Sequence, residues 1–164
     1  MKEEYFLDHI VDTSQYQVFL FSSPVPLPFF FARHCWFVVN NKGTITRVEF
    51  AKFGFKNNVT KIDIFKDKNK FCYGMTIYPS YSLRHIRYNS KIHFTVEGDK
   101  NSLAYKLASF ILTKSTKYPL IKEYKLLGPN SNTYPQWVLS HFPELKVKLP
   151  FLAVGKNYLK NRSK

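Results

Sequence analysis

The chain has 164 residues, 45% of them hydrophobic, including 16 Phe and 11 Tyr, which excludes a disordered or fibrous protein and predicts a buried core. Its formal net charge of +14 comes without an Arg cluster, a zinc-ligand spacing or an RNP-type aromatic motif, so specific binding of nucleic acid is not expected. The apolar stretch 18–39 is broken by prolines and by Arg33-His34, and it is too interrupted to cross a bilayer.

The first half of the chain predicts strands. Residues 16–21 have the composition of a strand, and the prolines of residues 24–28 indicate an extended connector, because proline donates no ladder hydrogen bond. A hairpin follows, and further along a short pairing segment and an alternating strand are expected. The hairpin strands are expected at residues 34–39 and 44–53, with a turn at 40–43. A break at 54–58 follows, then the short pairing segment at 61–65 and the alternating strand at 92–96.

Two helices are predicted in the second half of the chain. Apolar residues recur at helical spacing within residues 101–115, and Tyr118-Pro119 ends that helix. The last helix covers about residues 133–142 and is closed by Pro143, and an apolar closing segment with little regular structure follows. The expected fold class is therefore α+β, with a small antiparallel sheet packed against two main helices. We expect one domain over residues 1–164, with its core at about 15–159 and a basic tail at 156–164.

The spacing of the hairpin leads to an inference about His34. If Asn41-Lys42 form the centre of the turn, residues whose numbers sum to 83 are paired, and His34 lies directly opposite Glu49. A carboxylate beside an imidazole fixes its tautomer and favours the charged form that arises during proton transfer. The same spacing also fits an ordinary cross-strand polar pair, and a slip of one residue would remove the contact.

A second candidate element is the segment Gly128-Pro129-Asn130-Ser131-Asn132-Thr133-Tyr134, just ahead of the last predicted helix. Ser131 could act as a nucleophile if a neighbouring base took its proton, and His34 is the candidate base. Asn130, Asn132 and nearby backbone N–H groups could stabilise an oxyanion. Asn, Ser and Thr before an apolar run are also the residues that cap helices, so a purely structural role fits the same residues.

Proline decides where the helix cap is expected. If Ser131 were the N-cap, Pro135 would stand at N4, where a backbone donor is needed. If Thr133 is the N-cap, Pro135 falls at N2 and Thr133 forms a capping box with Gln136. We therefore expect the cap at Thr133, with Ser131 two residues ahead of it.

The cysteines and the remaining histidines offer little chemistry. Cys35 follows His34 in a predicted strand, so its side chain points to the opposite face and is not a nucleophile for that imidazole. Cys72 has apolar neighbours, and both cysteines are expected to be reduced thiols. No spacing among the other histidines suits a metal site, so neither a metal nor a cofactor is predicted.

Several motifs of the chain occur together in one known family. They are Ser22-Ser23-Pro24-Val25-Pro26-Leu27-Pro28, His34-Cys35-Trp36-Phe37-Val38-Val39, Tyr118-Pro119, the segment 128–134, Trp137, Pro143-Glu144-Leu145, Leu149-Pro150, Ala153-Val154-Gly155-Lys156 and Tyr158-Leu159. With these motifs, over about residues 17–159, the chain resembles a bacterial domain-of-unknown-function family, number 3750. This resemblance implies no established activity.

A more distant likeness suggests a chemistry. The order of His34 followed by an Asn-x-x-x-aromatic helix entry is similar to circularly permuted papain-like proteins, which include NlpC, lecithin–retinol acyltransferase relatives and the PPPDE isopeptidases. The likeness implies that His34 is the base and that Ser131 takes the nucleophile position, where those enzymes have cysteine. This chain also has Tyr134 in place of their phenylalanine, and Pro135 in the first turn. Because a thiolate is far more nucleophilic than a hydroxyl near neutral pH, cysteine-type hydrolysis is not expected to carry over unchanged.

The leading functional expectation is a serine/histidine hydrolase or acyltransferase that acts on an amide or ester substrate of unknown identity. In it Ser131 attacks, His34 is the base, and Glu49 orients the imidazole, a role that rests on the hairpin spacing alone. The first alternative is a non-catalytic binding module, a pseudoenzyme, on the permuted papain-like scaffold that the distant likeness implies. The second is a surface binder, in which a basic face and the Phe29-Phe30-Phe31 cluster together contact an acidic polymer or a membrane. A cytoplasmic location is expected because no signal peptide or transmembrane helix is recognised.

Overall fold

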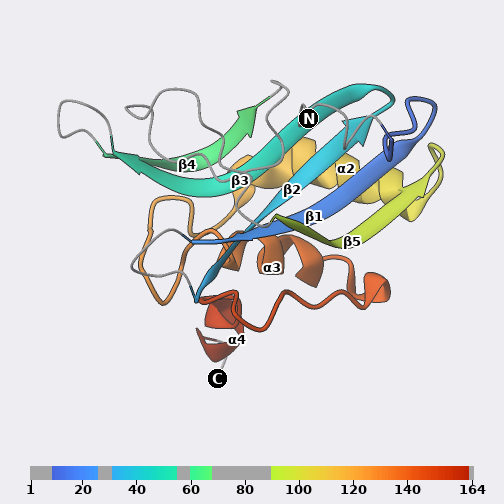
Figure 1. The fold of residues 1–164 in the computed structure, drawn as a ribbon. Helices are drawn as coiled ribbons and strands as arrows, with labels where there is room; N and C mark the ends of the chain where they lie inside the picture. Colours follow the sequence, from blue (N-terminus) through green and yellow to red (C-terminus); the bar gives the residue numbers. More distant parts are fainter. Residues whose placement is uncertain (1–8, 26–30, 55–59, 68–89, 163–164) are drawn as a thin grey trace.

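Five antiparallel strands form one sheet in the computed structural model, which describes residues 9–25, 31–54, 60–67 and 90–162. The strands are β1 (Tyr16–Pro24), β2 (Arg33–Asn41), β3 (Thr44–Gly54), β4 (Thr60–Asp67) and β5 (Lys91–Gly98). Their order across the sheet is β4-β3-β2-β1-β5, so β2 is the middle strand and lies between β3 and β1 (Figure 1). The helices are α2 (Leu103–Lys114), α3 (Thr133–Ser140) and α4 (Tyr158–Arg162), with 3₁₀ turns at Ser115–Lys117 and Pro143–Leu145. The predicted α+β class, an antiparallel sheet packed against two main helices, is confirmed.

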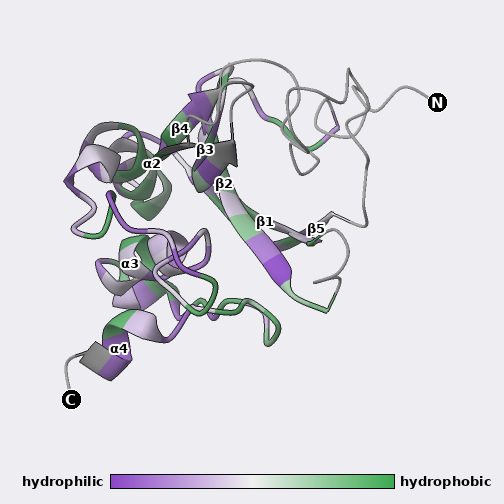
Figure 2. Ribbon diagram, turned by 90° about the vertical axis from the view of Figure 1, so that its left-hand side faces the viewer, coloured by the Kyte–Doolittle hydropathy of each residue, from purple (hydrophilic) through white to green (hydrophobic). Residues whose placement is uncertain are grey.

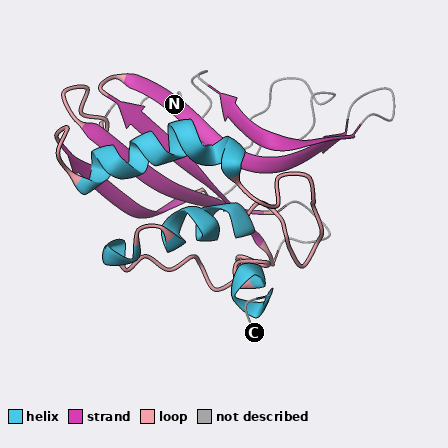
Figure 3. Ribbon diagram, turned by 180° about the vertical axis from the view of Figure 1, so that it is seen from behind, coloured by secondary structure: helices cyan, strands magenta, loops and turns pink. Residues whose placement is uncertain are grey.

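The helices lie on one side of the sheet. Figure 2 looks along the sheet and Figure 3 views it from behind, and both place α2 and α3 against the same face. Because side chains alternate along a strand, Phe37 and Val39 of β2 join the core under the helices, while Trp36 and Val38 belong to a second apolar cluster on the opposite face. Two buried faces explain why β2 reads as a nearly continuous apolar run.

The hairpin register differs from the predicted one. Asn41 pairs with Thr44, so the turn consists of Lys42 and Gly43, both with positive φ (48° and 88°). A two-residue turn of this kind needs two residues in the left-handed region, which glycine adopts without cost. The predicted centre at Asn41-Lys42 is therefore wrong, and paired residue numbers sum to 85 instead of 83. Because the shift is two residues, every side chain stays on its predicted face.

The start of α3 also differs from the prediction. The N-cap is Asn132, Thr133 is the first helical residue, and the expected capping box from Thr133 to Gln136 is wrong. The Thr133 hydroxyl donates instead to the Gly155 carbonyl, at 2.9 Å, and accepts the backbone N–H of Asn130. The Thr133 side chain is thus bonded to a residue distant in sequence and does not cap the helix. The helix begins one residue earlier than the local sequence pattern predicts.

Some predictions fall on residues outside the described ranges. These include most of the proline connector, the break after β3, two of the three phenylalanines at 29–31, and Cys72. In the part of the chain that is described, no helix combines the length and apolar character needed to cross a membrane.

Candidate functional site

His34 and Glu49 lie together, as the hairpin spacing predicts. The His34 Nε2 atom lies 2.6 Å from Glu49 Oε2, and the Arg47 guanidinium donates to the same oxygen at 2.9 Å. In the observed register the pair is diagonal rather than directly opposite, a separation that long side chains still bridge. Trp36 closes the group, since its ring stacks on His34 with centroids 5.5 Å apart and lies 4.3 Å from the Arg47 guanidinium carbon.

The electrostatics of this group keep Glu49 ionised. Burial alone would raise the pKa of the Glu49 carboxyl, but the charge of Arg47 and the hydrogen bond from His34 outweigh it and lower the pKa to about 2. All three polar side chains of the group are buried. The result is an imidazole held by an ionised carboxylate, on the face of the sheet opposite α2 and α3.

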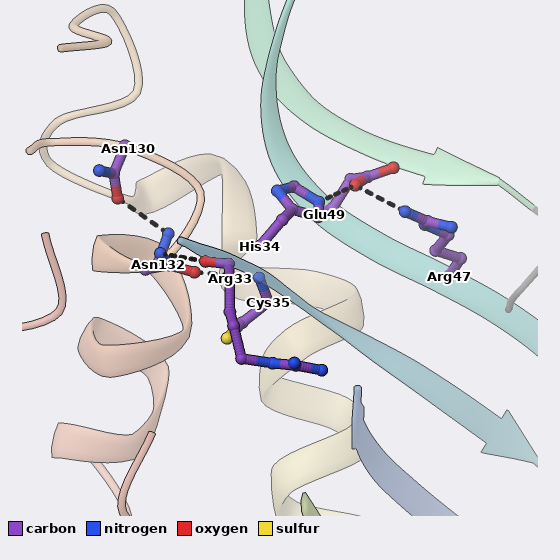
Figure 4. A network of polar contacts seen from close by, with 7 residues as sticks. All are labelled: Arg33, His34, Cys35, Arg47, Glu49, Asn130 and Asn132. Carbon is purple, nitrogen blue, oxygen red and sulfur yellow. Dashed lines mark hydrogen bonds and ion pairs between the residues drawn. The ribbon is translucent and has the colours of Figure 1, made fainter. Parts of the chain in front are cut away.

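The segment before α3 docks where β2 and β3 separate. The paired positions of these strands end at Phe37 and Val48, while β2 continues back to Arg33. There the Asn132 side chain takes the place of the missing strand, since its Oδ1 accepts the Cys35 N–H at 2.9 Å and its Nδ2 donates to the Arg33 carbonyl at 2.7 Å (Figure 4). The Asn132 amide therefore spans the two peptides on either side of His34. This brings the residue next to Ser131 onto the strand that carries the candidate base.

Both asparagines of the segment are committed to the fold. Asn132 Nδ2 also donates to the Val154 carbonyl at 2.8 Å, so each of its two amide hydrogens has an acceptor. Asn130 Nδ2 donates to the Leu126 carbonyl, and its Oδ1 accepts the Asn132 N–H. Gly155 packs directly on the Asn130 amide, and a Cβ there would lie 2.4 Å from Nδ2. An oxyanion could use the Asn132 side chain only by breaking one of these bonds.

Ser131 lies near the Tyr124 phenol and affects the pKa of that group. Burial raises the pKa of the Tyr124 phenol, hydrogen bonds from the Ser131 side chain and backbone lower it, and the Glu49 charge raises it further. Tyr124 packs on Phe50, with ring centroids 5.4 Å apart. Among the described residues, no hydrogen bond joins Ser131 to His34. The structure thus brings His34 and Glu49 together and ties the Ser131 segment to the same strand, with the Ser131 hydroxyl turned to a tyrosine that sequence reasoning did not select.

Cys35 is excluded as a nucleophile on physical grounds. Its side chain lies in the core under the helices, and burial raises the pKa of the thiol to about 12 despite the charges of Arg33 and Lys156. The thiol is therefore protonated at neutral pH.

A second serine–histidine contact was missed by the sequence analysis. Ser22 Oγ lies 2.6 Å from His93 Nε2, and Arg33 Nε donates to the same hydroxyl at 2.6 Å. Ser22 is fully buried, so a substrate carbonyl cannot reach its oxygen. Ser22 and His93 meet only because β1 pairs with β5, and the sequence around each residue does not predict that pairing.

Comparison with known proteins gives one match. A family model described as a protein of unknown function (DUF3750) matches residues 15–158. No curated protein and no solved structure matches the chain.

Proposed function

The chain belongs to the family of proteins of unknown function DUF3750, and from the geometry of its site we propose that it is a serine-dependent hydrolase or acyltransferase acting on an amide or ester. The observation that carries the proposal is the buried 2.6 Å hydrogen bond between His34 and Glu49. A second observation supports it, because Asn132, the neighbour of Ser131, is bonded to the peptides on both sides of His34. We further propose that the scaffold is a permuted papain-like one, with the base on a strand and the nucleophile at a helix entry.

The hydrogen bond to Glu49 defines which nitrogen of His34 is the base. An ionised carboxylate only accepts hydrogen bonds, so Nε2 carries the proton and Nδ1 of the neutral ring keeps its lone pair. In the proposed reaction the Ser131 hydroxyl leaves Tyr124 and reaches Nδ1 through the gap where the pairing of β2 and β3 has ended. It gives up its proton there and attacks the substrate carbonyl carbon. The imidazolium then protonates the leaving amine or alkoxide, which leaves an acyl group on Ser131. Water or a second nucleophile, deprotonated by the same nitrogen, releases the acyl group.

Labelling with a fluorophosphonate probe tests this proposal. Wild-type protein is expected to be labelled, Ser131→Ala to lose labelling, and Glu49→Gln to react roughly ten-thousandfold more slowly, as when the orienting carboxylate of a triad is neutralised. Ser22→Ala is the matched control, because it removes another hydroxyl that touches an imidazole but is inaccessible. Absence of wild-type labelling by several probes, or labelling that survives in Ser131→Ala, would reject the proposal.

A second candidate function has its own support. Ser131 is only 6% exposed, its hydroxyl lies near the Tyr124 phenol and lowers the pKa of that phenol, and the amides of Asn130 and Asn132 are used within the fold. These contacts fit a non-catalytic binding module in which the segment is a structural clasp, meaning that it only joins β2 to the C-terminal segment through its hydrogen bonds. An unlabelled wild-type protein that remains folded would favour this second function.

A further inference from the structure

Five large hydrophobic side chains are exposed in the described part of the chain, and they gather on one region of the surface. They are Phe31, Leu126, Leu127, Phe151 and Leu152. The most exposed are Phe151, at 91%, and Leu127, at 75%. Exposed leucines and phenylalanines scattered singly need no explanation, but a contiguous group of them marks an interaction surface.

Contacts between three segments show that the group is contiguous. The Arg33 N–H donates to the Leu152 carbonyl at 2.9 Å, which joins the start of β2 to the C-terminal segment. Leu127 and Phe151 line the same surface hollow, whose volume is about 280 Å³. In Figure 1 the start of β2, the loop before α3 and the segment before α4 meet at the lower left, and Figure 2, which views that side, has loop segments coloured as hydrophobic below β1.

Basic residues outnumber acidic ones in the part of the chain that carries most of these side chains. Residues 118–164 contain eight Lys and Arg against two Glu. The Lys156 ammonium lies 5.6 Å from the centroid of the Phe151 ring and donates a hydrogen bond to the Pro150 carbonyl at 2.6 Å. Lys122, Lys125 and Lys160 of the same segments are exposed. Protruding apolar side chains with a basic border match an interface between acyl chains and anionic headgroups.

We propose that this surface, formed by the five hydrophobic side chains and the lysines beside them, docks the protein on an anionic lipid bilayer. The apolar side chains enter the boundary between headgroups and acyl chains, and the lysines contact the headgroups. The proposal is independent of Ser131, since no residue of the surface takes part in the proposed reaction.

Sedimentation with vesicles tests this surface. Wild-type protein is expected to bind phosphatidylcholine vesicles containing phosphatidylglycerol, to release them at high salt, and to ignore vesicles of phosphatidylcholine alone. The double variant Leu127→Gln/Phe151→Gln should bind the anionic vesicles about tenfold less tightly or worse, because the two exposed side chains lose their burial in lipid. Both positions are solvent-exposed, so an unchanged circular dichroism spectrum and melting temperature are expected for the variant.

Two controls make the result decisive. Lys100→Gln/Lys106→Gln removes two exposed charges at the other end of the sheet and should weaken binding less than threefold, as expected for a distant contribution to net charge alone. Ser131→Ala should bind as wild type does, which separates this surface from the proposed activity. Failure of wild-type protein to bind anionic vesicles would overturn the proposal. So would equal binding by the apolar double variant, or preferential binding to soluble polyglutamate that ignores Leu127 and Phe151.

Discussion

Replacing Glu49 by Gln tests the buried charge group directly. The pKa of this carboxyl is about 2 in the folded protein against an ordinary value of 4.5, and each unit of pKa difference corresponds to about 1.36 kcal/mol. The ionised carboxylate therefore contributes about 3 kcal/mol to the free energy of unfolding. Because the folded value is the lower one, this contribution is fully present above about pH 4.5 and is lost as the pH falls towards 2.

Urea unfolding followed by tryptophan fluorescence measures the effect between pH 2.5 and 7. Wild type should exceed Glu49→Gln by about 3 kcal/mol at neutral pH, and the two proteins should converge as the pH approaches 2. Glu123→Gln is the control, since Glu123 pairs with Lys125 at the exposed surface and should change stability by no more than about 0.5 kcal/mol. If wild type and Glu49→Gln lose stability in parallel as the pH falls, then Arg47 and His34 do not hold this carboxylate ionised and the reasoning fails.

Three further predictions concern neighbouring residues. Asn132→Ala leaves the buried N–H of Cys35 and two partly buried carbonyls without their hydrogen-bond partner, so urea unfolding should register a loss of about 3 kcal/mol; a loss below 1 kcal/mol would argue against the clasp. In a Cys72→Ala background, the Cys35 thiol should not react with a disulfide reagent until the protein unfolds, because its pKa is about 12, and fast reaction in native conditions would contradict its burial. Tyr124→Phe removes the phenol oxygen that Ser131 contacts, so fluorophosphonate labelling should become about five- to tenfold faster; slower labelling would mean that the phenol assists the serine.

Periodicity and turn residues were sufficient to predict most of the sheet. Residues 16–21, 34–39 and 44–53 were all expected as strands, and they form the central part of the sheet. The contact of His34 with Glu49 was also predicted, although from a register that was wrong by two residues. It survived because side chains alternate with a period of two, so an even shift preserves the face while an odd one would have separated the pair.

The parts that sequence did not predict depend on contacts between distant segments. The capping side chain of Thr133 is diverted by the Gly155 carbonyl, and Tyr124 reaches Ser131 from a loop without regular structure. A sequence pattern relates a residue only to its near neighbours, so it cannot predict a hydrogen bond to a carbonyl 22 positions away. The short helix α4 was missed for a related reason, since five residues are too few to show a helical period.

Ser131 and Asn132 are adjacent in sequence, yet substitutions at them report on different properties. The Asn132 side chain closes the unpaired edge of β2, so its removal should lower stability and displace His34 at the same time. Ser131→Ala leaves those bonds intact, because none of them uses the Ser131 hydroxyl. A loss of labelling in Ser131→Ala with unchanged unfolding would therefore report chemistry at the hydroxyl alone. A loss of labelling in Asn132→Ala is informative only in comparison, because a misplaced base and a loosened fold both produce it. Catalysis is supported only if labelling is lost in the first variant while its stability is kept, and a clasp without catalysis predicts stability effects at Asn132 with no labelling at any position.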